Sequence, residues 1–274
     1  MPELPEVEVT RRGLLPDLAG AKASAVTFRT ESLRYPLPRQ LNKKLQDEVL
    51  REIRRRGKYL LFQFDTGVLL LHLGMSGSLR LVDKSCAPQK HDHVDIAFSN
   101  KTGNKILRLR DPRRFGALLW IEGDPAQHPL IAPLGIEPLD DGFTPQWLFQ
   151  QTRGLKAAIK VTLMDSHRIV GIGNIYASES LFRAGIDPRR AAGKISWRRI
   201  ERLVPAIRET LNQAIRAGGS SLRDFAHSDG GSGYFQLEAF VYGREGEACR
   251  VCGTTIKSLR QGQRATFYCP KCQR

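Results

Sequence analysis

The chain has 274 residues, of which 41% are hydrophobic, so it is long enough for two domains with apolar cores. Its 43 Lys and Arg residues against 28 acids give a net charge of +15, which favours a polyanionic partner. Nucleic acid is the first candidate, and an anionic membrane surface is the other. The longest apolar run, residues 67–75, is far shorter than the ~20 residues that cross a bilayer, so a spanning helix is excluded. Because the N-terminus lacks a basic region, we expect no signal peptide and a cytoplasmic location.

The first ten residues, MPELPEVEVT, predict the start of a helix. Pro5 suits a first helical turn, and the carboxylates of Glu6 and Glu8 favour the positive end of the helix dipole. This explanation does not cover Pro2 and Glu3, which precede the helix and need another reason.

Residues 22–121 predict a series of short strands, separated by Gly, Asn, Asp or Pro. Leu79 and Leu81 alternate with Arg80, as in a strand with one buried face. Regular short strands favour an antiparallel sandwich or barrel. The predicted strands are 23–28, 49–53, 58–64, 68–73, 78–82, 93–98, 106–110 and 117–121.

A segment rich in Pro, Gly and Asp, 122–143, is typical of a linker, and a helical pattern follows it. Helices are predicted over 144–152, 174–185 and 196–218, and Pro205 predicts a kink in the last one or a boundary between two helices. The chain is therefore predicted to be α+β. Its expected domains are a β-rich part, 1–133, a helical part, 134–240, and a cysteine module, 241–274.

The cysteine module carries the most specific spacing in the chain, CRVC and CPKC. Two such pairs hold one Zn²⁺ in a tetrahedral site, and four thiolates leave no open position for chemistry, so the predicted zinc is structural. The loop between the pairs, with Lys257, Arg260 and Arg264, predicts a basic ribbon for a nucleic-acid backbone. Alone, such a ribbon would also suit a transcription factor or a ribosomal protein. The four ligands are Cys249, Cys252, Cys269 and Cys272, and Cys86 is left over.

Three other stretches favour nucleic-acid binding, each with a simpler alternative. In RRRGKYL, Lys58 is placed at the mouth of a strand, where a solvated cationic edge is equally expected. In DPRRFG, Arg113 and Phe115 offer a cation and an apolar wedge together, as a protein that kinks a duplex requires. In HLGMSG, Met75 is a second wedge, although a Met that fills a core gap is the commoner case.

Three glycine- or histidine-containing turns complete the candidates. GIGNIYASE predicts a phosphate seat at a helix N-terminus, with Asn174 as a cap or phosphate ligand. SDGGSGYF, 228–235, is either a lid over a bound base or an ordinary linker. His91 and His93 in KHDHVD have no apparent third ligand, so a structural turn is favoured over a metal site.

Taken in order, the motifs MPELPEVE, RGKYL, HLGMSGSL, HDHVD, DPRRFG, VGIGNIYASE, SDGGSGYF and QRATFYCPKC resemble those of the formamidopyrimidine-DNA glycosylase family. The resemblance covers nearly the whole chain. It implies an N-terminal β-sandwich with a helix at its start, a helix–two-turn–helix domain and a zinc finger, with DNA in the cleft between the domains. It also implies a monomer that excises formamidopyrimidines and 8-oxoguanine from duplex DNA and then cleaves the abasic site by β,δ-elimination.

The resemblance assigns roles to individual residues. Pro2 becomes the nucleophile once Met1 is removed, and Glu3 is the general acid. Met75, Arg113 and Phe115 fill the gap left by the extruded base. Lys58 and Arg264, beside the reacting nucleotide, are also implied to be catalytic. Further residues are implied to contact the DNA or the base: Asn174 and Tyr242 at phosphates, His93 on the DNA, Lys156 in handling oxidised guanine, Glu8 near the base pocket, and the loop 220–234 over the base.

Two alternatives stay open. Endonuclease VIII, which removes oxidised pyrimidines, shares the Pro-Glu start and the zinc finger, but it has Gly where this chain has Leu4 and lacks the Met and Phe wedges. A non-catalytic zinc-ribbon protein would show the same charge and cysteines, but would have no reason to keep Pro2 and Glu3. The chain departs from the family pattern at Val9, where Thr is expected, and at Val161, where Pro is usual.

Overall fold

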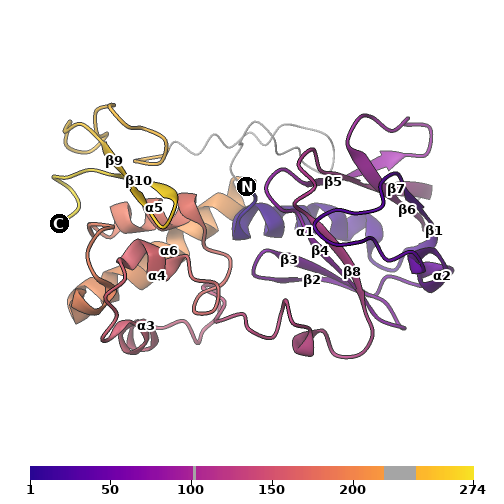
Figure 1. Cartoon of the computed structure of the whole chain (residues 1–274), viewed down its shortest axis with the longest axis horizontal. Helices are drawn as coiled ribbons and strands as arrows, with labels where there is room; N and C mark the ends of the chain where they lie inside the picture. Colours follow the sequence, from indigo (N-terminus) through magenta and orange to yellow (C-terminus); the bar gives the residue numbers. More distant parts are fainter. Residues whose placement is uncertain (101–102, 219–238) are drawn as a thin grey trace. The chain divides into compact units, whose positions relative to one another are not determined.

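The computed structural model describes residues 1–100, 103–218 and 239–274 (Figure 1). Within these ranges the chain forms two compact units. The first contains Met1–Ala132, and the second contains Pro133–Arg216 together with the described C-terminal residues, 239–274. The cysteine module therefore forms one compact unit with the helical part of the chain. The division into three domains, with its predicted boundaries, stays a prediction.

The first unit is built on two four-stranded antiparallel sheets. One has the order β1-β6-β7-β5 and the other β2-β3-β4-β8. Three of the six neighbouring pairs are consecutive in sequence, and the pairs β1-β6, β7-β5 and β4-β8 are not. All eight predicted strands are present, with the second displaced to Glu52–Arg56. The strands are β1 (Lys22–Phe28), β2 (Glu52–Arg56), β3 (Tyr59–Gln63), β4 (Val68–His72), β5 (Ser78–Asp83), β6 (Asp92–Asn100), β7 (Gly103–Arg110) and β8 (Ala117–Ile121).

Helix α1 (Leu4–Leu18) packs its apolar side into the core of this unit. Val7, Leu14 and Leu18 are fully buried there with side chains of both sheets, such as Phe62 and Leu107. The short helix α2 (Leu41–Leu45), which the sequence pattern did not predict, buries two leucines in the same core. The helix start at residues 2–6 is thereby anchored to a rigid sandwich.

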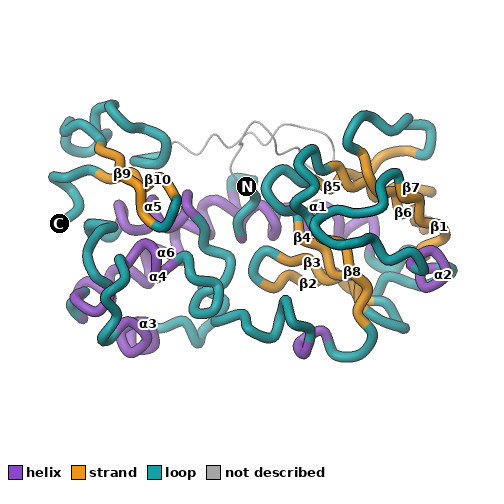
Figure 2. Tube along the Cα trace, viewed as in Figure 1, coloured by secondary structure: helices purple, strands orange, loops and turns teal. Residues whose placement is uncertain are grey.

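The second unit is mainly helical, and Figure 2 shows its helices in purple. Its longest helix, α6, keeps Leu203, Ile207 and Leu211 on one buried stripe, as the spacing predicts. Pro205 lies inside α6, which continues as one helix, so the predicted boundary there is absent. The helices are α3 (Pro145–Thr152), α4 (Ile159–Leu163), α5 (Asn174–Arg183) and α6 (Trp197–Arg216), and the short 3₁₀ turns are Pro125–Gln127 in the first unit and Ala192–Lys194 in the second.

The chain closes with a two-stranded hairpin, β9 (Lys257–Gln261) and β10 (Arg264–Tyr268). A small apolar cluster joins the module to α5: Phe182 packs with Val241, Ile256 and two of the cysteines. Among the described helices, none has both the length and the apolar character needed to span a membrane.

Candidate active site and nucleic-acid interface

The N-terminal residues are held by the first turn of α1. Glu3 is the N-cap, and a capping box ties it to Glu6, whose Oε2 accepts a hydrogen bond from the Glu3 backbone N–H at 2.8 Å. Pro2 is buried, and Glu3 and Glu6 are only 2% and 1% exposed. The predicted nucleophile and general acid therefore sit on a rigid support at the positive end of a helix, where a carboxylate is stabilised.

Glu8, one turn further along α1, has a different environment. Its carboxylate accepts hydrogen bonds from Arg11 at 2.8 Å, Arg12 at 2.7 Å and Arg55 at 3.2 Å. Burial alone would raise the pKa of Glu8, but the bonds from Arg11 and Arg12 and the charges of Arg11 and Arg55 outweigh it and hold the pKa at about 2. Glu8 is thus a permanent anion that ties α1 to β2, which gives it a structural role whatever its distance from a bound base.

Lys58 lies in the turn between β2 and β3, next to a histidine that the sequence pattern did not single out. Burial and, to a smaller extent, the charges of Lys58 and Arg34 together lower the pKa of His72 to about 4. The neutral ring then accepts a hydrogen bond at Nδ1 from the Gly74 N–H, at 3.0 Å. His72 thus stays uncharged at neutral pH and shapes the loop that carries Met75.

The predicted wedge residues lie on two neighbouring loops. Met75 is on the loop between β4 and β5, and it is partly exposed. Arg113 and Phe115 are on the loop between β7 and β8, where the Arg113 guanidinium carbon lies 4.8 Å from the centroid of the Phe115 ring. Phe115 is 47% exposed, one of the few large apolar side chains so exposed among the described residues. The guanidinium packs against the exposed ring and keeps it in place, which suits a side chain that stacks against bases.

His93, also in the first unit, contacts the first residue of the loop that carries Arg113 and Phe115. Its Nε2 lies 3.0 Å from the backbone O of Asp111, which opens that loop. His91 has a left-handed backbone, with φ of 75°. This geometry agrees with the structural turn expected at His91, which lies directly before β6.

In the second unit, Asn174 is the first residue of α5, as the Gly-bounded turn predicts. Its side-chain Oδ1 is buried and has no hydrogen-bond partner among the described residues. Because an amide oxygen is an acceptor, this atom needs a donor from outside the described residues, such as a water molecule. The predicted role of Asn174 at a phosphate stays a prediction.

Tyr242 is positioned by Glu179, a buried acid of helix α5. The Glu179 carboxylate accepts from the backbone N–H groups of Phe240, Val241 and Tyr242, at 2.8–3.0 Å. The Tyr242 ring meets Phe267 of β10 edge to face, with centroids 5.3 Å apart. The sequence pattern did not identify Glu179, because an acid inside a helix usually faces solvent.

Arg264 opens β10 after a two-residue turn, Gly262-Gln263, in which both residues have positive φ. Such a turn matches the twist of the two strands and projects the hairpin tip outward. Arg264, Lys257 and Arg260 are all exposed. The predicted basic ribbon is therefore formed.

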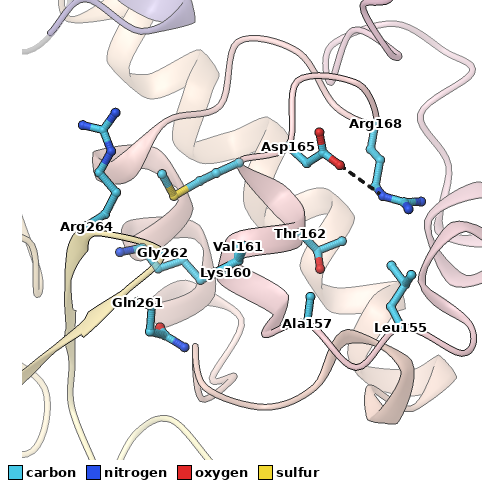
Figure 3. Close-up of a pocket in the computed structure, with 11 residues that line it drawn as sticks. Leu155, Ala157, Lys160, Val161, Thr162, Asp165, Arg168, Gln261, Gly262 and Arg264 are labelled. Atoms are coloured by element: carbon cyan, nitrogen blue, oxygen red, sulfur yellow. Dashed lines mark ion pairs between the residues drawn. The ribbon is translucent and has the colours of Figure 1, made fainter.

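A pocket of about 460 Å³ lies between α4 and this hairpin (Figure 3). Figure 3 shows Arg264 at one end and the ion pair of Asp165 and Arg168, 3.3 Å apart, at the other. On the wall between them, Lys160 is 1% exposed and donates to the Ala265 backbone O and to Thr266 Oγ1, both at 2.8 Å. Lys160 thus fixes the strand that carries Arg264.

Lys156, the lysine chosen from the sequence in LKAAIK, is exposed on the loop before α4. Its role in handling oxidised guanine stays a prediction. The sequence analysis overlooked Lys160 in the same stretch, because only the fold shows that this lysine is buried and bonded to another element.

The four cysteines of the module converge on one point. Their sulfur atoms all lie within 4.8 Å of one another, with Cys252 and Cys269 at 3.4 Å and Cys249 and Cys272 at 3.9 Å. A zinc ion at about 2.3 Å from four sulfurs requires separations of roughly 3.8 Å, whereas a disulfide requires about 2.05 Å. The donor set and spacing fit one structural zinc, as predicted.

Comparison with known proteins agrees with these sites. Three family models match in order: the formamidopyrimidine-DNA glycosylase N-terminal domain over residues 1–118, the H2TH domain of the same enzymes over 134–226, and a zinc finger found in FPG and IleRS over 246–274. The formamidopyrimidine-DNA glycosylase of Aromatoleum aromaticum is 57% identical over 274 residues, and that of Cupriavidus pinatubonensis is 54% identical over 283 residues, each covering both chains fully.

Solved structures give the same answer. The MutM (Fpg) protein of Thermus thermophilus superposes with a TM-score of 0.87 at 36% identity, covering 99% of this chain and 98% of that one. A Lactococcus lactis Fpg variant bound to DNA containing Fapy-dG gives 0.90 at 33% identity, with both chains fully covered. A MutM complex with DNA containing carbocyclic 8-oxo-G gives 0.89 at 34% identity, again over both chains in full. The chain therefore belongs to the formamidopyrimidine-DNA glycosylase family.

Proposed function

We propose that the chain removes oxidised purines, namely formamidopyrimidines and 8-oxoguanine, from duplex DNA, and then cleaves the strand at the abasic site. Family membership over the full length and the relatives solved with damaged DNA support this proposal. The observation that carries the catalytic part of the proposal is the buried Pro2-Glu3 pair at the start of α1, which a non-catalytic zinc-ribbon protein has no reason to keep.

In the proposed mechanism the nitrogen of Pro2, free after removal of Met1, attacks C1′ of the damaged nucleotide. The bond from C1′ to the base breaks, and the base leaves with the electron pair and a proton. Glu3 protonates the sugar ring oxygen, which opens the ring. An α-amino group has a pKa of roughly 7.7–8, so a useful fraction of it is neutral and nucleophilic at cellular pH.

The secondary amine determines the next step. Its adduct with C1′ is an iminium, which is always cationic and withdraws electrons from C2′. A proton then leaves C2′, the 3′ phosphate is eliminated, and a second elimination expels the 5′ phosphate. Hydrolysis of the iminium returns the free proline, so no oxidant or reductant is required.

The remaining residues would bind and deform the DNA. Lys58, His93, Lys156, Asn174, Tyr242 and Arg264 are proposed at phosphates or at the damaged nucleotide, while Met75, Arg113 and Phe115 fill the space of the extruded base. Extrusion costs a few kcal/mol, which the inserted side chains offset. The loop 220–234, expected to close over the base, lies outside the described residues. The four-cysteine site, when it holds zinc, supplies a rigid base for the hairpin that carries Arg264.

A family relative from Lactococcus lactis has been solved with DNA containing an oxidised pyrimidine, so the substrate test needs both lesion classes. The chain is incubated with duplexes that carry 8-oxoguanine, thymine glycol or no lesion. We expect the 8-oxoguanine strand to be cut fastest. Faster cutting of thymine glycol would favour the endonuclease VIII alternative, and no cutting would favour a non-catalytic DNA-binding protein. We further propose that the chain works as a monomer in the bacterial cytoplasm, where its DNA substrate lies.

A further inference from the structure

We infer that Asp111 holds the Met75 loop and the Arg113–Phe115 loop in one fixed arrangement. It is therefore a positioning residue for lesion recognition. This inference rests on the proposed function, because it concerns how the base-filling side chains are held. Asp111 itself touches neither DNA nor the reacting atoms in that function.

The carboxylate of Asp111 is shared between the two loops. It is completely buried, and Oδ1 accepts from Ser76 Oγ at 2.9 Å, the residue directly after Met75. Oδ2 accepts from the Gly116 backbone N–H at 2.7 Å, directly after Phe115. The Arg113 N–H lies 3.3 Å from both Oδ1 and Ser76 Oγ, which closes the network.

The main chains of the two loops also touch. A Cβ at Gly74 would lie 2.5–2.7 Å from the backbone atoms of Phe115 and Gly116, so only a glycine fits there. Gly74 also has a φ of 63°, which favours glycine. A Cβ at Gly116 would in turn meet the His72 backbone O at 2.8 Å. Neither loop has room to shift toward the other.

Together these contacts couple the two loops. If one loop moved alone, a buried carboxylate oxygen or backbone N–H would lose its partner, which is unfavourable in a site closed to water. Met75 and Phe115 should therefore enter the DNA together, and their contributions to base extrusion should not be independent.

The test is a double-mutant cycle of Met75→Ala and Phe115→Ala, made in the parent chain and in a Ser76→Ala background. Ser76→Ala removes one bond to Asp111 and leaves the apolar core untouched. Ser78→Ala is the matched control, because Ser78 is also buried but is not a donor to Asp111. The readout is the single-turnover rate of 8-oxoguanine excision, with cleavage of a pre-formed abasic site as the reference.

We expect the two alanine substitutions to be non-additive by at least about fivefold in the parent chain and in Ser78→Ala. In Ser76→Ala their effects should multiply to within about twofold. Ser76→Ala alone should slow excision several-fold while abasic-site cleavage stays within about twofold. Asp111→Asn, which keeps the side-chain shape, should act in the same direction as Ser76→Ala and more strongly.

An unchanged coupling factor in Ser76→Ala would overturn the inference, as would equal losses on both substrates. The proposed function has its own signature of failure, which is an absence of 8-oxoguanine excision in the parent chain. Thermal unfolding of each variant shows whether a uniform loss reflects a damaged fold, a result that would also count against a positioning role.

Discussion

The two units of the chain hold their functional residues by different physical means. In the N-terminal unit, buried carboxylates fix backbone groups above a large apolar core: Glu6 holds the N–H of Glu3, and Asp111 holds the loop around Phe115. In the C-terminal unit the hairpin that carries Arg264 has only a small apolar cluster beneath it, with Val241 and Ile256. Because this apolar cluster is small, the hairpin depends for its stability on the four cysteines, which can hold zinc, and on the hydrogen bonds of the buried Lys160.

The difference indicates which perturbations stay local. A sandwich with many buried leucines tolerates the loss of one polar contact, whereas a small module without its metal has little else to keep it folded. The chemistry at Pro2 and Glu3 should therefore be separable from DNA binding through the zinc module. The following predictions test whether catalysis and DNA binding can be separated in this way.

The largest effect is expected from Glu3→Gln. Loss of a general acid typically costs 10²–10⁴-fold, so 8-oxoguanine excision should fall by about 10³-fold. Cleavage of a pre-formed abasic site should fall less, because an open aldehyde needs less acid assistance. Single-turnover gel assays on both substrates measure the difference.

The matched control is Glu8→Gln, on the same helix but held by arginines. Its excision rate should stay within a few-fold of the parent rate. If Glu3→Gln excised 8-oxoguanine as fast as Glu8→Gln, Glu3 would not be the acid.

The next effect is expected from Cys269→Ser or from removal of zinc. Since zinc binding and folding of such a module are coupled, the hairpin should lose its structure and DNA affinity should fall roughly 100-fold. The N-terminal sandwich should unfold at nearly its usual temperature. Fluorescence anisotropy and calorimetry provide the two measurements.

Cys86→Ser is the control, because Cys86 is exposed and lies in the other unit. It should change neither quantity. Normal DNA affinity in a verified metal-free chain would show that the C-terminal module does not depend on zinc.

Phe115→Ala tests the N-terminal unit alone. On the proposed function the exposed ring fills the gap that the extruded base leaves in the duplex, so excision of 8-oxoguanine should fall about tenfold. Abasic-site cleavage, which needs no base extrusion, should fall no more than two- to threefold. Val251→Ala, which removes another exposed apolar side chain, serves as the control and should leave both rates unchanged. Equal losses on the two substrates would assign Phe115 to general DNA binding.

The smallest effect is on stability and appears only as a dependence on pH. The folded-state pKa of Glu8 is about 2, below its ordinary value of 4.5, so its contribution is fully present above pH 4.5 and is lost as the pH falls toward 2. Glu8→Gln should therefore lower the free energy of unfolding by about 1–3 kcal/mol at pH 7. The deficit should shrink toward pH 2. Urea titrations across this range would contradict the account if the deficit did not depend on pH.

Much of this molecule could be predicted from the sequence, because short-range patterns dominate it. Alternating residues such as Leu79 and Leu81 indicated strands, the stripe through Leu203 and Leu211 indicated a long helix, and the cysteine spacing indicated the metal site. The family and its activity followed from eight motifs in order, and the comparisons confirm them.

The supporting residues could not be predicted in the same way. Asp111 precedes a proline and suggested only a turn. Glu179 looked like an ordinary polar position of a predicted helix, and Lys160 lay in a stretch for which no helix or strand was predicted. Their partners lie 5 to 106 residues away in the chain, and only the folded structure brings them together. Of the two alternatives at Pro205, the boundary between two helices is absent, because the buried stripe of α6 outweighs the hydrogen bond that a proline removes.

The most direct test of the central claim is to trap the covalent intermediate. Sodium borohydride is added while the chain, with Met1 removed, acts on an 8-oxoguanine duplex, and the protein–DNA adduct is then mapped by peptide mass spectrometry. The account predicts that the adduct is on the nitrogen of Pro2, and that a chain retaining Met1 binds DNA but neither excises the base nor forms the adduct. An adduct on Lys58 or another lysine, or normal excision by the chain that retains Met1, would contradict it.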